Sequence, residues 1–172
     1  MLLFRNFRKS DNGPTRDEKL EAARCRLAEA ASQDKIIAIV REAARGIFGA
    51  DGVTFVLRDY TMCHYVEEDA ISPLWKGQKF PMTSCISGWA MLNSQTAVIT
   101  DIFTDPRIPH AVYRKTFVKS LIMVPIGLET KIAAMGAYWR DQRDFSDDDV
   151  QTVETMADHV GQALKRAAGM AA

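Results

Sequence analysis

Apolar residues recur at helical spacing near both ends of the chain and predict a helix in each place. Residues 34–48 carry a broad apolar face, the pattern of a helix that covers a sheet. Its members are Ile36, Ile37, Ile39, Val40, Ala43, Ala44, Ile47 and Phe48. The last helix is expected from Ser146 onward, with an apolar face made by Val150, Val153, Met156, Val160 and Leu164.

A further helix is expected from about Arg16, with a narrower apolar stripe. The stripe consists of Leu20, Ala23, Leu27, Ala30 and Ala31, and its width suits a seam between two helices. Thr15 and Glu18 have the spacing of a capping box, which starts a helix. Ser32 marks a second helix start, and Gly49 provides a C-terminal stop.

The middle of the chain alternates in the manner of strands. We expect strands at residues 53–58, 61–68, 96–100, 121–128 and 131–139, with short helices at 88–93 and 111–119. Glu129 and Thr130 join the last two strands tightly, which predicts an antiparallel hairpin. Residues 71–82 contain two prolines and Trp75 and have no sustained period, so a loop or short strand is expected there.

This order of elements predicts an α+β domain. A central antiparallel sheet would carry the N- and C-terminal helices on one face and loops with short helices on the other. We divide the chain into a flexible leader at residues 1–14, a helical extension at 15–33, one domain at 34–168 and a short tail at 169–172.

Composition limits the partners that this domain can have. The chain has 172 residues, 47% of them apolar, which is enough for one core. Lysine and arginine total 22 and match 22 aspartates and glutamates, so no net field favours nucleic acid or an anionic membrane. No apolar run approaches the roughly 20 residues that cross a bilayer, and the N-terminus lacks the order of a secretory signal. We therefore expect a cytoplasmic protein.

The segment at residues 80–126 resembles the middle of a GAF domain, a small-molecule sensing module of many bacterial signalling proteins. Three features carry the resemblance: the small-residue loop from Ser84 to Trp89, the run from Asp101 to Arg107, and the apolar strand that ends at Val124-Pro125-Ile126. The resemblance covers roughly residues 34–165. It implies a ligand pocket between the sheet and the inserted helices.

That pocket would be lined by Trp75, Ser84, Cys85, Ser87, Trp89, Asp101, Arg107, Tyr113 and Phe117. Two interpretations of its small-residue loop stay open. The serines and Gly88 can present amides and hydroxyls to a polar ligand group at a helix start. Alternatively, the serines cap the helix and Gly88 permits close packing against a strand. Capping is the simpler interpretation.

Asp101, Asp105 and Arg107 also allow two interpretations. A carboxylate and a guanidinium six residues apart across this turn can form an ion pair that holds the loop. The same groups can instead meet a ligand at the rim of the pocket. We favour the structural ion pair.

The three cysteines, Cys25, Cys63 and Cys85, show no CxxC spacing and predict neither a disulfide framework nor a zinc site. Cys63-His64 resembles a bilin-attachment dipeptide, but adjacent strand residues point to opposite faces, which argues against covalent chromophore binding. One GAF branch reduces free methionine sulfoxide with cysteine thiols. Only Cys85 lies in the expected pocket region, so we expect Cys85 to be poorly reactive and Cys85→Ala to change little.

We conclude from the sequence that the chain is a non-enzymatic sensory or regulatory domain. It would bind an unidentified small molecule or a protein such as a histidine kinase, and it would form a homodimer through its terminal helices. The signature that accompanies cyclic nucleotide binding in many GAF domains is not found, and no cofactor can be assigned. The alternatives are a dimerisation scaffold without a ligand and, with less support, a free methionine sulfoxide reductase.

Overall fold

The computed structural model describes residues 13–170 of the chain. The first 12 residues of the expected leader and residues 171–172 of the expected tail lie outside the described residues. Within the described part, helices are α1 (Arg16–Glu29), α2 (Gln33–Phe48), α3 (Ile86–Asn93), α4 (His110–Tyr113) and α5 (Asp147–Met170), with a 3₁₀ turn η1 (Met82–Ser84). Strands are β1 (Gly52–Asp59), β2 (Met62–Ala70), β3 (Lys79–Pro81), β4 (Ala97–Ile99), β5 (Ser120–Ile126) and β6 (Ala133–Trp139).

The strands form one six-stranded sheet in the order β3-β2-β1-β6-β5-β4, and every pair of neighbours is antiparallel. The predicted antiparallel hairpin is confirmed as the β5–β6 pair, but its connection is longer than expected and runs from Gly127 to Ile132. A register shift between Phe55 and Val56 in the β1–β2 pair marks a bulge. Phe55 belongs to the hydrophobic core between the sheet and α2, and Val56 belongs to the core on the opposite face of the sheet.

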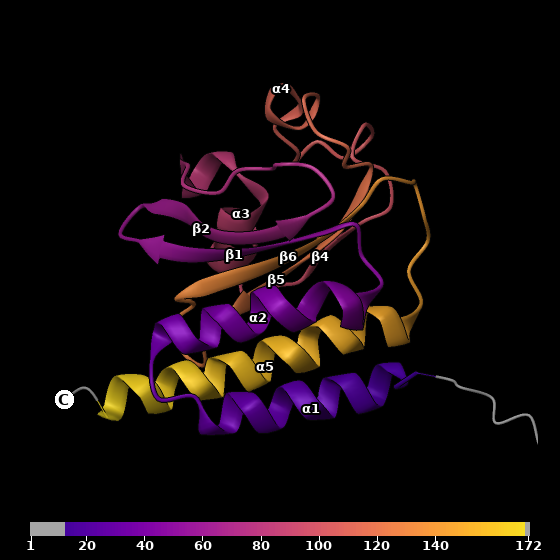
Figure 1. The fold of residues 1–172 in the computed structure, drawn as a ribbon. Coiled ribbons are helices and arrows are strands. Elements are labelled where there is room, and N and C mark those ends of the chain that lie inside the picture. Colours follow the sequence, from indigo (N-terminus) through magenta and orange to yellow (C-terminus); the bar gives the residue numbers. More distant parts are fainter. Residues whose placement is uncertain (1–12, 171–172) are drawn as a thin grey trace, which may run out of the picture.

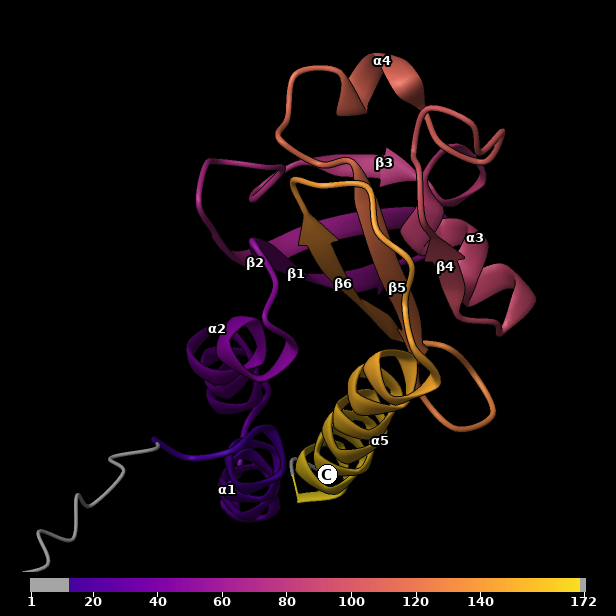
Figure 2. The ribbon, with the colours of Figure 1, turned by 90° about the vertical axis from the view of Figure 1, so that its right-hand side faces the viewer.

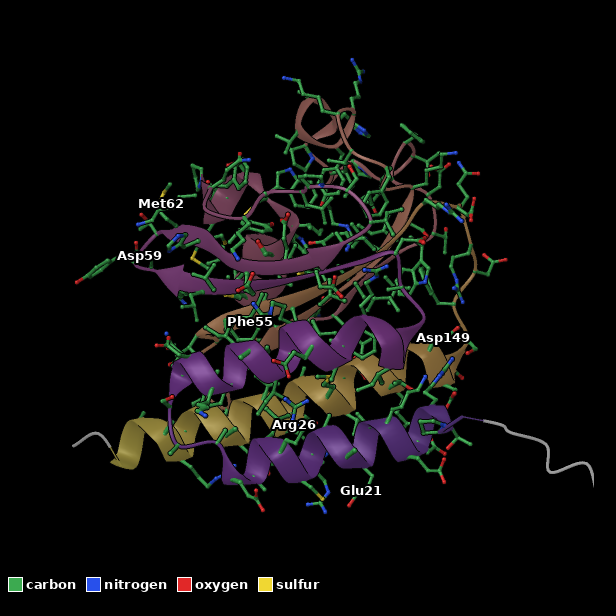
Figure 3. All side chains as sticks on the ribbon, viewed as in Figure 1. Glu21, Arg26, Phe55, Asp59, Met62 and Asp149 are labelled. Atoms are coloured by element: carbon green, nitrogen blue, oxygen red, sulfur yellow. The ribbon has the colours of Figure 1, made fainter. Side chains whose placement is uncertain are left out.

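The helices separate onto the two faces of the sheet, as the predicted α+β class requires. Helices α2 and α5 lie side by side against one face, and α3 and α4 lie on the other (Figures 1 and 2). Phe55 lies between the sheet and the α2 layer (Figure 3). The first face therefore has a continuous hydrophobic core, and the second face holds the candidate site.

Helix α1 forms a third layer beneath α2 and α5 (Figure 2). Ala23, Leu27 and Ala30 of its apolar stripe are buried in the core that α2 and α5 share. Arg166 of α5 donates a hydrogen bond to the carbonyl of Leu27 at 2.9 Å. Three of the five residues of the stripe are therefore buried within one chain, Leu20 is half-buried and Ala31 is exposed. This burial weakens the reason for expecting a dimer through α1.

The predicted helix boundaries are confirmed at most ends. Thr15 and Glu18 form the capping box at the start of α1, and Ser32 caps α2 with its side chain. Gly49 ends α2 in the left-handed conformation with φ 60°. Two predictions were wrong: α4 spans only His110–Tyr113 instead of residues 111–119, and α5 continues through residues 169–170, where a tail was expected.

Candidate functional site

The second face of the sheet carries an aromatic cluster centred on Trp75. The Trp75 ring lies 4.8 Å from Tyr113, 5.6 Å from Tyr65 and 5.6 Å from Tyr138, measured between ring centroids. Only 4% of Trp75 is exposed. The expected loop is present, but Trp75, which the resemblance places in the lining of a pocket, is part of the buried cluster on this face.

The loop that carries Trp75 is held by one carboxylate. Glu68 of β2 accepts backbone N–H groups from Leu74 at 3.0 Å, Trp75 at 2.8 Å and Lys76 at 2.9 Å. Three hydrogen bonds to one charged acceptor fix a short segment firmly. The aperiodic loop is thereby ordered without being a helix or a strand.

A groove of about 350 Å³ lies between this loop and α4. It is lined by Pro73, Leu74, Trp75, Gln78, Phe80, Ala111, Val112, Lys115 and Thr116. Its size is at the lower end of the range for small-molecule sites, and its walls combine apolar and polar groups as such sites do. Trp75 both lines the groove and packs against Tyr113.

The Tyr113 hydroxyl is buried without a hydrogen-bond partner among the described residues. The residue is only 3% exposed, and burial raises the pKa of its hydroxyl well above the ordinary value. The hydroxyl is therefore neutral and can donate as well as accept. Buried hydroxyls nearly always have a partner, so a polar group of a ligand or a water molecule would complete this one.

The other hydroxyls of the cluster are paired. Tyr138 and Thr54 are 2.8 Å apart between their oxygens, and Tyr65 and Ser87 are 3.0 Å apart. Burial raises the pKa of Tyr65 and of Tyr138. Tyr113 is thus distinguished from its two tyrosine neighbours by its lack of a partner.

The serines of the small-residue loop do not cap α3. Cys85 occupies the N-cap position and makes no side-chain cap bond. The Ser84 hydroxyl is exposed and donates to the Pro81 carbonyl at 3.1 Å, whereas Ser87 is buried and faces Tyr65. The capping interpretation was therefore wrong for both serines, because the turn η1 turns Ser84 away from the helix start.

Gly88 does permit a close approach, but to η1 rather than to a strand. A Cβ at this position would lie 1.9 Å from the Met82 carbonyl oxygen and 2.4 Å from the Met82 Cα. Only glycine leaves room for two backbone segments at this distance.

Cys85 has a cysteine neighbour that the sequence does not suggest. Cys63 of β2 is fully buried and belongs to the same buried cluster as Cys85. The Cys85 sulfur also lies 3.3 Å from Ser87 Oγ and 3.4 Å from the Pro81 carbonyl oxygen. The expectation that Cys85 stands alone in this region was wrong.

The loop before α4 is held by a local ion pair rather than by the expected wider one. Arg107 pairs with Asp105, with nitrogen–oxygen distances of 3.0 and 2.6 Å. Asp101 instead accepts the Phe103 backbone N–H at 2.9 Å. The Arg107 guanidinium stacks over Trp89 at 4.5 Å from the ring centroid. The hydrogen bonds from the Arg107 guanidinium lower the pKa of Asp105.

The candidate residues therefore fall into separate groups. Trp75, Tyr113, Cys85 and Ser87 share one interior, and Phe117 packs on its border beside Gly52. Trp89, Asp101 and Arg107 belong to the loop before α4 and to its contact with α3. The described residues contain no cluster of His, Cys, Asp and Glu that would hold a metal ion. No helix among them is long and apolar enough to span a membrane.

Sequence comparison assigns the family. A family model described as a GAF domain matches residues 30–165. The chain belongs to the GAF domain family. A search of curated proteins finds no significant match.

Solved structures with the same fold differ in function. A free methionine-R-sulfoxide reductase from Neisseria meningitidis, in complex with its substrate, matches with a TM-score of 0.76 and 18% identity over 90% of each chain. The GAF domain of a phosphoenolpyruvate-protein phosphotransferase from Coxiella burnetii matches with a TM-score of 0.78 and 12% identity, over 91% of this chain and 96% of that one. A far-red absorbing protein with bound biliverdin matches with a TM-score of 0.70 and 18% identity, over 87% of this chain and 99% of that one. At these identities, the likeness concerns the fold alone.

Several residues of the site could not be selected from the sequence pattern. Tyr65, Tyr138, Glu68 and Cys63 all come from strands β2 and β6, where the pattern shows only that a strand exists. One signal was present: Cys63 and Tyr65 are two residues apart on β2 and so share a face. Placing that face against Cys85 required the β2–β3 register, in which Cys63 pairs with Phe80.

Proposed function

We propose that this chain is a non-enzymatic sensory GAF domain that binds a small ligand at the groove beside Trp75. The ligand would place an apolar part against Leu74 and Phe80 and a polar group on the Tyr113 hydroxyl. Because that hydroxyl is buried and Tyr113 is not among the residues that line the groove, binding would require the loop at residues 73–78 to shift. GAF domains in general are sensory or ligand-binding modules, which agrees with this proposal.

The observation that carries the proposal is the unpaired Tyr113 hydroxyl. A buried hydroxyl without a partner lowers stability by about 1–3 kcal/mol. A phenylalanine would avoid that cost in a protein whose only task is to fold. The hydroxyl therefore supports a role in binding, with the groove beside it as the place of entry.

We expect Tyr113→Phe to raise the free energy of unfolding of the ligand-free protein by about 1 kcal/mol, because the substitution removes an unpaired buried oxygen. The same substitution should abolish retention of any small molecule that copurifies from the native host. Denaturant melts measure the first effect, and native mass spectrometry of protein from that host measures the second.

Tyr138→Phe is the matched control for this test. It removes a hydroxyl that is paired with Thr54 at 2.8 Å and leaves the Thr54 oxygen buried without that partner. We expect a loss of about 1–3 kcal/mol. If Tyr113→Phe instead destabilised the protein to the same degree and no molecule were retained, the ligand proposal would fail in favour of a scaffold.

A thiol reductase is the second candidate function, since free methionine-R-sulfoxide reductases share the fold and two cysteines belong to the buried cluster of the site. Incubation with free methionine sulfoxide and a thiol reductant tests it directly. Measurable formation of methionine that disappears in Cys85→Ala would establish the enzyme. We expect none above the rate of the reductant alone.

The partners stay predictions. A cytoplasmic location, a histidine kinase as output partner and a homodimer are consistent with a signalling GAF domain. The burial of most of the α1 stripe weakens the support for a dimer through this helix. Light scattering at high micromolar concentration measures the oligomeric state.

A further inference from the structure

We propose that the groove beside Trp75 recognises a small amphipathic carboxylate, whose acid group pairs with the Lys115 ammonium. This inference rests on the proposed function and narrows its ligand from an unidentified small molecule to an aryl or alkyl monocarboxylic acid. The apolar body of such a molecule would lie against Leu74 and Phe80, and its carboxylate would lie at the edge of the groove formed by the residues after α4.

The two segments that form the groove contain no acidic residue. Residues 71–80 supply one wall and residues 110–119 the other, and neither range contains an aspartate or a glutamate. Together they carry five lysines and arginines, which are Lys76, Lys79, Arg114, Lys115 and Lys119. The whole chain has equal numbers of acidic and basic residues, so this is a local excess of positive charge. A cleft lined by one sign of charge attracts ligands of the opposite sign.

Lys115 is the one charged residue in the lining of the groove. Its side chain is exposed and takes part in no salt bridge or side-chain hydrogen bond among residues 13–170. The lysines of the opposite wall differ in this respect, since Lys76 pairs with Glu67 and Lys79 pairs with Asp59. Lys115 therefore presents an uncompensated positive charge to whatever enters the groove.

Three other donors beside the groove are occupied within the chain. Two backbone N–H groups of the loop donate to the Glu68 carboxylate, and the Thr116 hydroxyl donates to the Tyr113 carbonyl at 2.8 Å. The Gln78 side chain lines the groove and makes no hydrogen bond to another described residue. An anion in the groove thus meets the Lys115 ammonium and the Gln78 amide.

This pair of donors suits a carboxylate. A carboxylate carries one negative charge and two acceptor oxygens, so it can bind an ammonium and an amide at the same time. A phosphate monoester carries a charge of about −2 near neutral pH, which a single lysine does not balance.

The rest of the groove suits an apolar body. Leu74 is buried, and Phe80 and Val112 are partly buried against the same cluster. A cavity of about 150 Å³ holds a benzene ring, so a groove of about 350 Å³ has room for one ring and a short acidic side chain. Apolar walls with a few polar groups are the usual composition of small-molecule sites.

The test compares phenylacetate with its neutral amide, phenylacetamide, and hexanoate with hexanamide, by ligand-observed NMR on the full chain. Within each pair the apolar body is the same and only the charge differs. We expect each acid to bind about fivefold more tightly than its amide, the factor that corresponds to a strong exposed ion pair. Raising the salt concentration should reduce this preference, because salt screens exposed charges.

Lys115→Gln removes the charge at the groove. It should lower the affinity for the acids by about five- to tenfold and leave the affinity for the amides within about twofold. Lys119→Gln is the matched control, since it makes the same change in net charge in the same segment at a residue outside the groove lining. This control should keep the preference for the acids.

Equal binding of acid and amide, or an equal loss for both in Lys115→Gln, would overturn the recognition of a carboxylate and leave a ligand site at the groove. Absence of binding by both acids at millimolar concentration would also overturn it. The proposed function has its own readout, the loss of a copurified molecule in Tyr113→Phe. A neutral copurified molecule that depends on Tyr113 would support the proposed function and contradict the carboxylate, so the two failures are distinguishable.

Discussion

Trp75→Ala should lower the free energy of unfolding by about 3–5 kcal/mol, the usual cost of truncating a buried aromatic residue. The reason is the position of the ring, which packs edge-on or tilted against Tyr65, Tyr113 and Tyr138 within 5.6 Å of each. Removing it leaves a cavity between the sheet and α4 that the three tyrosines cannot fill without moving. Denaturant melts measure the loss.

Trp89→Ala is the comparison variant, since Trp89 is only half-buried, packs at the edge of the same cluster and lies under the Arg107 guanidinium. Because less of its surface is buried than that of Trp75, this variant should lose less stability. Adding indole to Trp75→Ala should recover part of the loss, because a dry apolar cavity binds an aromatic molecule of matching shape. Equal losses in the free energy of unfolding for the two variants would show that the Trp75 cluster is not a packed core.

The helices were predictable because their signals are local. Thr15, Ser32 and Gly49 mark helix ends by the hydrogen bonds and backbone angles that these residue types favour, and each one does so in the structure. The broad stripe of α2 likewise depends only on spacing along one helix. The GAF resemblance then placed these elements in the right order around the sheet.

The interior of the site was not predictable in the same way. Strand β6 is buried at every position, so alternation cannot show which face carries Tyr138. Trp75 gave no periodic signal because its loop is ordered by Glu68, a residue of another element. The presence of Cys63 and Cys85 in one buried cluster depends on strand register and on the turn η1, neither of which a pattern of residue types specifies.

The ion-pair partner of Arg107 also could not be predicted from residue spacing. Arg107 was expected to pair with Asp101, the carboxylate six residues away, and spacing alone did not point to Asp105. In the structure Arg107 pairs with Asp105, which also accepts the Arg107 backbone N–H at 2.9 Å, whereas Asp101 accepts the backbone N–H of Phe103. The contacts within one short turn decide the pair, and residue spacing does not specify them.

Gly88→Ala should be at least as disruptive as an overpacked core substitution, with a loss of about 3 kcal/mol or more. The added Cβ would lie 1.9 Å from the Met82 carbonyl oxygen and 2.5 Å from its carbonyl carbon. These are backbone atoms, so no side-chain rotation relieves the clash. Either η1 or the start of α3 must move, and both carry the neighbours of Cys85 and Ser87.

Gly46→Ala is a control for which we expect the opposite change in stability. Gly46 lies inside α2, and a Cβ there would meet nothing within 4 Å. Alanine in a helix interior is favoured over glycine by about 0.8–1 kcal/mol, so this variant should be more stable than the native chain. Denaturant melts of the two variants compare the effect of one added methyl group at a position with free space and at a position filled by backbone atoms. A Gly88→Ala protein as stable as Gly46→Ala would mean that η1 and α3 do not approach as closely as the structure places them.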